Sequence, residues 1–238
     1  MYILCSLLML SCFRAKEDKL SLLVVRGGHT YDTPDFENMC SNLDGVNATL
    51  VLNSHFYDMK IDEIKEKYDA ILFLNQNKHY SEYDWNKKKY IVLTKHGIGM
   101  VFLHFTLSSQ PEWDEYHDLI GGKWFLKNYT EDEKLHSTYF TDMTLDIEVI
   151  DKNHPVTKAL ENFTLKDAYY GNIYRDPSVH PLLGSNHSDV SSVIAWSHYY
   201  NKSKIVYVMP GFTKEAYENT SYKKLITNAL YYVGLNRN

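Results

Sequence analysis

Basic residues, cysteines and long apolar segments are all scarce in this chain of 238 residues, and each scarcity excludes a class of protein. The 25 Lys and Arg are outnumbered by 30 Asp and Glu, which leaves a net charge of -5. No broad positive field attracts nucleic acid, so nucleic acid is not expected as a partner. Three cysteines are too few for a disulfide framework. The 44% of hydrophobic residues suffices for one large buried core.

The N-terminus is apolar over residues 1–12, which is too short for a spanning helix but suits the core of a signal peptide. Ser11 directly before Cys12 resembles a bacterial lipobox, in which the cysteine becomes lipidated, and residues 14–19 then form a polar tether. An ordinary secretory signal and a frayed cytosolic N-terminus are the alternatives. We therefore expect a signal and tether over 1–19, a domain over 20–238, and a place in the bacterial cell envelope. Membrane contact would come only through the lipid on Cys12.

Strands and helices alternate along the first half of the chain. Apolar runs predict strands at 20–26, 48–52, 68–74 and 98–104, and the intervening patterns predict helices at 34–43, 61–67, from Ser81 to His96, and at 111–120. Such alternation with short connections predicts a parallel sheet covered by helices on both sides. The fold class is thus α/β, a flavodoxin-like three-layer sandwich.

The second half departs from this pattern. Residues 144–150 alternate in polarity, which indicates an antiparallel strand at an edge or in an excursion from the domain. Three further strands are predicted at 179–183, 192–196 and 205–209, followed by a closing helix at 221–233. We expect no second domain, since neither a repeat nor a low-complexity linker is present.

Polar residues follow the predicted parallel strands, where ligands bind in open sheets of this kind. His29 follows the first strand and His104 ends the fourth, so two imidazoles are expected on neighbouring strand ends of one rim. They suit proton transfer, or a metal ion with a third ligand. The structural alternative is that His29 bonds its own turn and His104 caps a strand. Trp113 and Tyr116 share a helix face and are either core residues or a sugar platform.

Four segments carry a family resemblance. Gly27-Gly-His-Thr-Tyr-Asp32, residues 97–104, residues 113–122 and Asn153-His-Pro-Val-Thr157 resemble the signature segments of the ThuA (trehalose utilisation) family. The resemblance implies a class I glutamine-amidotransferase-like fold that lacks the nucleophilic cysteine, because the turn after the fourth strand offers His104 instead. Thiolate-based glutamine hydrolysis is therefore excluded. Cys40, in a predicted helix, is expected to be a buried small hydrophobe.

The resemblance also implies a small-molecule carbohydrate as ligand, and an enzyme that converts it. The acid-base or metal-binding groups would be His29 and His104, with Asp167 as an orienting carboxylate; the substrate-binding residues would be Gly28, Tyr31, Asn75, Trp113 and Tyr169. No cofactor is expected beyond a metal ion that the two histidines could hold.

Two departures from the family pattern leave a rival hypothesis open. Ala168 stands where relatives carry a second carboxylate, and Phe212 stands where they carry a histidine. A non-catalytic sugar-binding or scaffold lipoprotein would fit these losses, and a metal-dependent hydrolase is a third hypothesis. His154, in the Asn-His-Pro segment, is expected to serve a turn and cap rather than catalysis.

Overall fold

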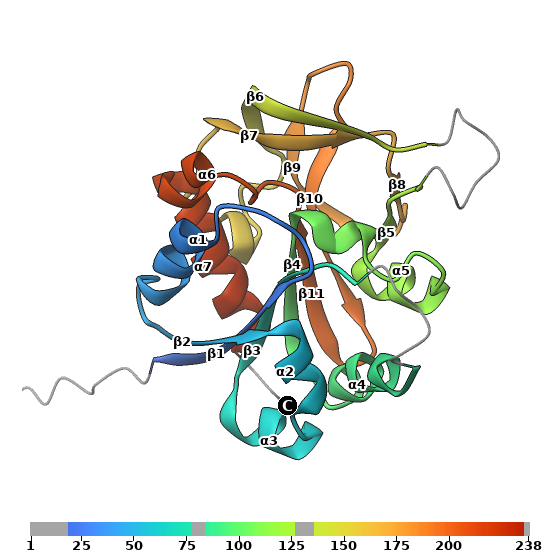
Figure 1. Ribbon diagram of the computed structural model, residues 1–238. Coiled ribbons are helices and arrows are strands. Elements are labelled where there is room, and N and C mark those ends of the chain that lie inside the picture. The colour runs from blue at the N-terminus through green and yellow to red at the C-terminus, as the bar shows by residue number, and fades with distance from the viewer. Residues whose placement is uncertain (1–18, 78–83, 127–135, 236–238) are drawn as a thin grey trace, which may run out of the picture.

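The computed structural model describes residues 19–77, 84–126 and 136–235, and its centre is a nine-stranded sheet (Figure 1). The strand order is β2-β1-β3-β4-β11-β10-β9-β6-β7. The predicted signal and lipid anchor, with Cys12, and the predicted helix start at Ser81 lie outside the described residues.

Five strands of the sheet are parallel to one another. They are β1 (Leu20–Gly27), β2 (Val46–Leu52), β3 (Ala70–Asn75), β4 (Gly99–Leu103) and β11 (Ser203–Val208). Every residue of β3 and β4 is buried, as expected for parallel strands covered on both faces. Four antiparallel strands extend the sheet: β10 (Val193–Tyr200), β9 (His180–Ser185), β6 (Thr138–Val149) and β7 (Phe163–Gly171). A separate pair joins β5 (Gly122–Lys123) to β8 (Tyr174–Arg175).

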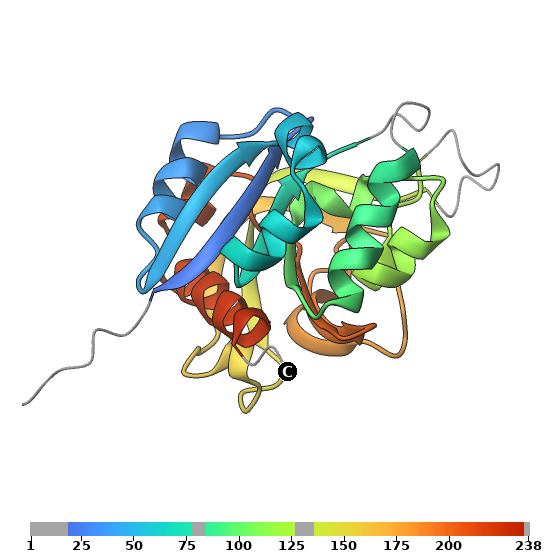
Figure 2. The same cartoon turned by 90° about the horizontal axis from the view of Figure 1, so that it is seen from below.

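Helices cover both faces of the parallel strands (Figures 1 and 2). The chain moves outward from β1 to β2 and then back across β1 to β3, so right-handed crossovers place the helices of the two steps on opposite faces. One face carries α1 (Thr33–Ser41), α6 (Lys214–Glu218) and α7 (Thr220–Gly234); the other carries α2 (Asn53–Asp58), α3 (Ile61–Lys67), α4 (Asp84–Lys95) and α5 (Asp114–Ile120). This confirms the predicted three-layer α/β sandwich.

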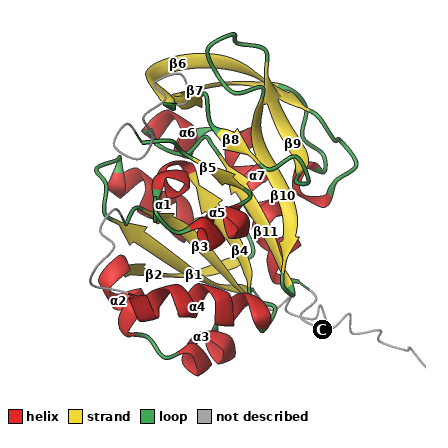
Figure 3. Cartoon of the chain, turned by 90° about the vertical axis from the view of Figure 1, so that its right-hand side faces the viewer, coloured by secondary structure: helices red, strands yellow, loops and turns green. Residues whose placement is uncertain are grey.

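The antiparallel excursion is larger than the alternating segment suggests. Its first strand, β6, covers Thr138–Val149 and so lies within residues 123–151, where the alternating pattern is found; β7 was not predicted. Figure 3 shows β6 and β7 extending past the helical layers. The short helices α2 and α6 were also missed, because six and five residues are too few to show a helical period. Of the described chain, no helix is long and apolar enough to cross a membrane.

A buried lysine joins two helices of one layer. Lys89 on α4 is 1% exposed, and its Nζ donates to the carbonyl oxygens of Phe56, Tyr57 and Met59, at 2.6, 2.7 and 2.7 Å. These carbonyls lie at the end of α2, where helical partners run out. One ammonium thus satisfies three acceptors and offsets the cost of its own burial.

Replacement of this lysine by methionine is expected to destabilise the fold. Lys89→Met keeps most of the side-chain volume but removes the donor from three carbonyls, two of them in buried contacts, which should cost about 2–4 kcal/mol of unfolding free energy. Lys88→Met, at the exposed neighbouring position, is the matched control and should stay within about 0.5 kcal/mol of the parent. Urea titrations of both variants measure the difference, and equal midpoints would contradict the role given to Lys89.

Candidate functional site

A cavity of about 220 Å³ opens at the carboxyl ends of the parallel strands. Its polar lining residues follow β1, β3 and β4, and they are His29, Gln76, His104 and Ser108. Aromatic side chains form most of the remaining wall: Phe105, Trp124, Tyr139, Tyr170 and Phe212. The strand order reverses between β1 and β3, so the cavity lies at the topological switch point where open α/β sheets bind ligands.

His104 sits in an unusual backbone conformation at the base of this cavity. The sequence predicts that His104 is the last residue of a strand. In the structure β4 ends at Leu103, and His104 begins a 3-10 turn over His104–Ser108 with φ of +44°. Few residues other than glycine adopt this region, and such conformations cluster at functional sites. The Tyr207 hydroxyl donates to the His104 carbonyl at 3.0 Å and holds the turn in place.

The ring of His104 is fixed in one tautomer. Its Nδ1 lies 2.7 Å from the Met209 carbonyl oxygen, which can only accept, so Nδ1 carries the hydrogen and Nε2 keeps a free lone pair. The residue is 1% exposed, and burial, helped by the nearby His29, lowers the pKa of His104 to about 3. His104 is therefore a neutral imidazole at physiological pH.

His29 lies on the exposed side of the same cavity. His29 Nδ1 lies 2.7 Å from the carbonyl oxygen of the next residue, Thr30. The His29 ring stacks on Phe105 with 4.8 Å between the ring centroids. The sequence predicts neighbouring strand ends for the two histidines, but β3 lies between β1 and β4. Phe105 and Phe212 each contact both imidazoles and thereby connect them.

Gly28 allows the loop after β1 to pass close to the loop after β3. It has φ of +81°, and a Cβ at this position would lie 1.8 Å from the Gln76 carbonyl oxygen. Only glycine lets the turn after β1 pass so near the turn after β3. The position thus brings His29 and Gln76 to one cavity.

Asp167 supports a loop that borders the cavity but does not line the cavity itself. It is fully buried on β7, and its carboxylate accepts from the backbone N–H of Gly211, Phe212 and Thr213, at 2.5, 3.2 and 3.0 Å. Burial raises the pKa of Asp167 to about 6, although these hydrogen bonds oppose the rise. The carboxylate does not line the cavity. It holds the loop after β11, whose Phe212 ring packs on His104.

Neither Gly28 nor the four other residues predicted to bind substrate are among the lining residues of this cavity. Tyr31 packs edge-on against Phe36, and Asn75 donates to Asn53 on the α2 side of the sheet. Trp113 is 8% exposed and packs against Tyr90 and Tyr116, as its core interpretation predicts. Tyr169 is buried and donates to the Leu165 carbonyl.

Two of the lining residues that the sequence does not predict are direct neighbours, in the sequence, of residues that it does predict. Successive side chains of a strand point to opposite faces, so Tyr170 reaches the cavity and Tyr169 does not. Gln76, one position after Asn75, lines it in the same way. Trp124 and Tyr139 come from the segment around β5 and β6, whose position over the cavity depends on long-range pairing that local pattern does not reveal.

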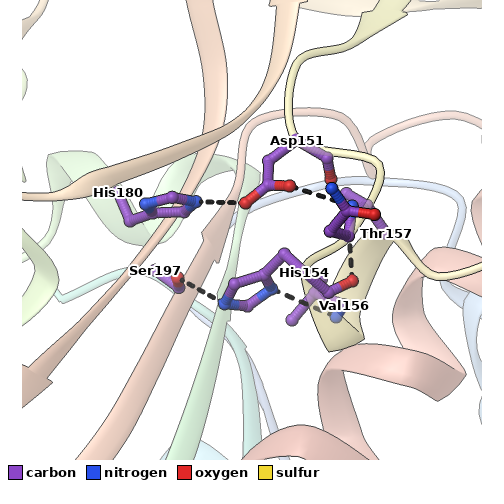
Figure 4. Close-up of polar contacts among 7 residues, drawn as sticks. Asp151, His154, Val156, Thr157, His180 and Ser197 are labelled. Carbon is purple, nitrogen blue, oxygen red and sulfur yellow. Dashed lines mark hydrogen bonds and ion pairs between the residues drawn. The ribbon is translucent and has the colours of Figure 1, made fainter.

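A second group of histidines lies at the other end of β6 and β7 (Figure 4). His180 Nε2 contacts Asp151 at 2.8 Å, and His154 Nε2 lies 3.3 Å from Ser197 Oγ. The two imidazole rings stack at 5.3 Å. The set contains the side chains of a serine hydrolase triad, so its hydrogen-bond directions decide its role.

Those directions exclude a triad. The Val156 backbone N–H donates to His154 Nδ1 at 3.2 Å, so Nδ1 is the acceptor and Nε2 carries the hydrogen of the neutral ring. His154 therefore donates to Ser197 and cannot take its proton. The carboxylate of Asp151 bonds His180 rather than His154. The predicted cap role of His154 is confirmed by its contact to the 3-10 turn at Pro155–Thr157.

The positions of the described residues bear on both metal binding and thiol chemistry. Among the described residues, no group of three or more His, Cys, Asp or Glu side chains is placed to hold a metal ion. Cys40 is fully buried in α1, and burial raises the pKa of its thiol far above the ordinary value, which fits the predicted small hydrophobe.

The Asp167 contacts predict a large effect of removing its carboxylate. Asp167→Ala leaves three backbone N–H groups, that of Gly211 buried, without their acceptor, and we expect a loss of about 2–4 kcal/mol in unfolding free energy. Asp118→Ala removes an exposed carboxylate on α5 as the control. Thermal and urea unfolding measure both; a loss at Asp167 no larger than that at Asp118 would contradict this assignment.

The neutral state of His104 predicts a pH dependence of stability. Its folded pKa of about 3 is below the ordinary value of 6.5, so the unfolded chain binds one more proton between these limits. Stability from this residue is present above pH 6.5 and falls with decreasing pH. His104→Asn, which keeps a donor for Met209 and tolerates positive φ, should flatten the stability profile near pH 5 by about 1.4 kcal/mol per pH unit.

Urea titrations from pH 7 to pH 4 measure this slope. Two other groups also change the stability of the parent protein with pH. Burial lowers the pKa of His117 to about 4, so His117 also loses stability as the pH falls. Asp167 has the opposite effect, because its pKa, raised to about 6, adds stability as the pH falls through that value. The change in slope between parent and variant isolates His104. His96→Asn removes an exposed imidazole as the control. An unchanged slope in His104→Asn would show that His104 is charged in the folded protein.

Solved structures share this fold at low sequence identity. A ThuA-like protein from Parabacteroides merdae superposes with a TM-score of 0.74 at 15% identity, covering 91% of this chain and 90% of that one. A cytoplasmic protein from Salmonella typhimurium gives 0.64 at 10% identity, covering 90% and 100%. A β-galactosidase from Rahnella sp. R3 gives 0.60 at 9% identity, over 90% of this chain and 31% of the enzyme. No curated protein matches the sequence.

A family model described as ThuA, trehalose utilisation, matches residues 26–233. The match spans His29, His104, Asp167 and Phe212, and it agrees with the class I glutamine-amidotransferase-like fold that the resemblance implies. Family membership associates the chain with trehalose utilisation in general terms. This chain belongs to the ThuA family.

Proposed function

We propose that this ThuA-family protein binds an uncharged carbohydrate, trehalose or a related glycoside, in the cavity at the sheet edge and converts it without a cysteine nucleophile. The observation that carries the proposal is the lining of the cavity. Five aromatic rings surround two imidazoles, and no Asp, Glu, Lys or Arg is among the described lining residues. Aromatic faces with a few polar groups suit a flat, neutral, hydroxylated ring.

The two histidines differ in the chemistry they offer. His104 presents a neutral Nε2 in a buried position, so it can accept a hydrogen bond or a proton from a substrate hydroxyl. His29 is exposed and can exchange protons with solvent. In this proposal His104 orients or activates the hydroxyl, His29 transfers the proton, and Asp167 keeps the loop after β11 in place. A metal ion held by the two imidazoles would find no third His, Cys, Asp or Glu ligand among the described residues.

The non-catalytic alternative has one specific observation in its favour. The family resemblance implies a histidine where this chain has Phe212, and the Phe212 ring contacts both imidazoles, at 5.0 Å from His104 and 5.8 Å from His29. An apolar ring there leaves a binding surface with fewer proton-transfer groups. A sugar-binding or scaffold lipoprotein, anchored in the cell envelope through Cys12, is therefore the second candidate.

Ligand-dependent melting tests the carbohydrate proposal. Trehalose should raise the melting temperature in a concentration-dependent way, because a ligand that prefers the folded state stabilises it. Trehalose 6-phosphate should raise it less, since the described residues of the cavity lining include no Lys or Arg for a phosphate. Tyr170→Ala should abolish the shift, whereas Tyr199→Ala, at a 65% exposed tyrosine on β10, should retain it. No shift with trehalose or any of a panel of related glycosides would contradict the proposal.

Substitution of the histidines then separates enzyme from binding protein. If the cavity is catalytic, His29→Ala and His104→Asn should each reduce turnover of the bound sugar by at least about 100-fold while the fold is retained. Product analysis by mass spectrometry provides the rate. Binding without any product in long incubations with the parent protein would favour the non-catalytic candidate.

A further inference from the structure

The two imidazoles on the sheet side of the cavity have their Nδ1 positions committed elsewhere. His104 gives its Nδ1 hydrogen to the Met209 carbonyl, and the structure records no hydrogen bond to its Nε2 among the described residues. His29 gives its Nδ1 hydrogen to the Thr30 carbonyl in the same way. In the neutral rings, each Nε2 is then an acceptor.

Gln76 completes the set through its contact with Ser108. The Ser108 hydroxyl lies 2.9 Å from the Phe105 carbonyl, which takes its one hydrogen. The Gln76 amide nitrogen, 2.5 Å from the same Oγ, must therefore be the donor in that contact. The orientation of the amide follows, and Gln76 Oε1 remains as an acceptor without a recorded partner in the described chain.

The opposite wall has a different polarity. Trp124 carries an indole N–H, which can only donate, and the hydroxyls of Tyr139 and Tyr170 can donate or accept. A ligand between the two walls thus meets the imidazole and amide acceptors on the side of β1, β3 and β4, and groups able to donate at Trp124, Tyr139 and Tyr170. A ligand hydroxyl can donate to the acceptors and accept from the donors. A ketone, an ether or a carboxylate that faces the histidines has no hydrogen to donate, so its oxygen lone pairs meet the lone pairs of the acceptors.

We infer that the cavity selects its ligand by hydrogen-bond donation to His29, Gln76 and His104, and accepts ring alcohols in preference to ring ketones, ethers and acids. This inference rests on the proposed function only in equating the ring alcohol with a sugar. A buried acceptor left without its donor weakens binding by about 10- to 100-fold, so the discrimination should be measurable with simple probes.

Two ring fragments of equal size test the preference. Cyclohexanol and cyclohexanone differ by two hydrogen atoms, and only the alcohol donates. Titration of isotope-labelled protein, followed through the His104 ring signals by NMR, should give at least tenfold tighter binding for cyclohexanol. His104→Asn, which removes Nε2 but keeps a donor for Met209, should reduce this preference, while His96→Asn should preserve it. Equal binding of the two fragments, or binding of neither, would overturn the inference.

The tautomer of His104 provides a second test that needs no ligand. Long-range ¹⁵N–¹H spectra distinguish a protonated Nδ1 from a protonated Nε2, and the structure predicts protonated Nδ1 with bare Nε2 from pH 8 to pH 5. A protonated Nε2 would overturn the inference even if sugars bind. An alcohol preference with the expected tautomer, but without binding of any glycoside, would instead contradict the carbohydrate proposal alone.

Discussion

The carboxylate of Asp167 holds the loop on which the geometry of the cavity depends. By accepting three consecutive backbone N–H groups it fixes residues 211–213 behind the cavity. That loop follows directly on the Met209 carbonyl, which orients His104, and it carries the Phe212 ring that packs on both imidazoles. A fully buried carboxylate is costly unless it is paired in this way. These contacts give Asp167 a role in supporting the site rather than in contacting a substrate.

Burial shifts the pKa values of the two groups joined by this loop in opposite directions. It drives the pKa of His104 down to about 3 and that of Asp167 up to about 6, because in each case the charged form loses hydration. The cavity consequently presents lone pairs and aromatic faces in place of a strong field. Such a site discriminates ligands by hydrogen-bond direction and shape, which suits a neutral polyol better than a phosphate or an acid. The same criterion of hydrogen-bond direction separates the cavity from the His154 group, where the imidazole donates to Ser197.

The layered fold was predictable from sequence because its parallel strands are continuous apolar runs, and β3 and β4 are buried at every position. The convergence of His29 and His104 was predictable as well, since carboxyl ends of parallel strands share one edge. The remaining lining was not. Tyr170 and Gln76 differ from the chosen Tyr169 and Asn75 by one position, and a shift of one residue in a strand exchanges the two faces. Trp124 and Tyr139 reach the cavity through the pairing of β5 with β8 and of β6 with β7, which no local pattern encodes.

A crystal structure of the protein soaked with trehalose tests the central claim most directly. The claim predicts a sugar ring in the cavity between the aromatic walls, with a hydroxyl oxygen within hydrogen-bond distance of His104 Nε2 and with Nδ1 still in contact with the Met209 carbonyl. A sugar bound elsewhere on the molecule would contradict it. So would a His104 ring that has turned away from Met209, because the Asp167-supported loop would then not determine what the imidazole offers to the ligand.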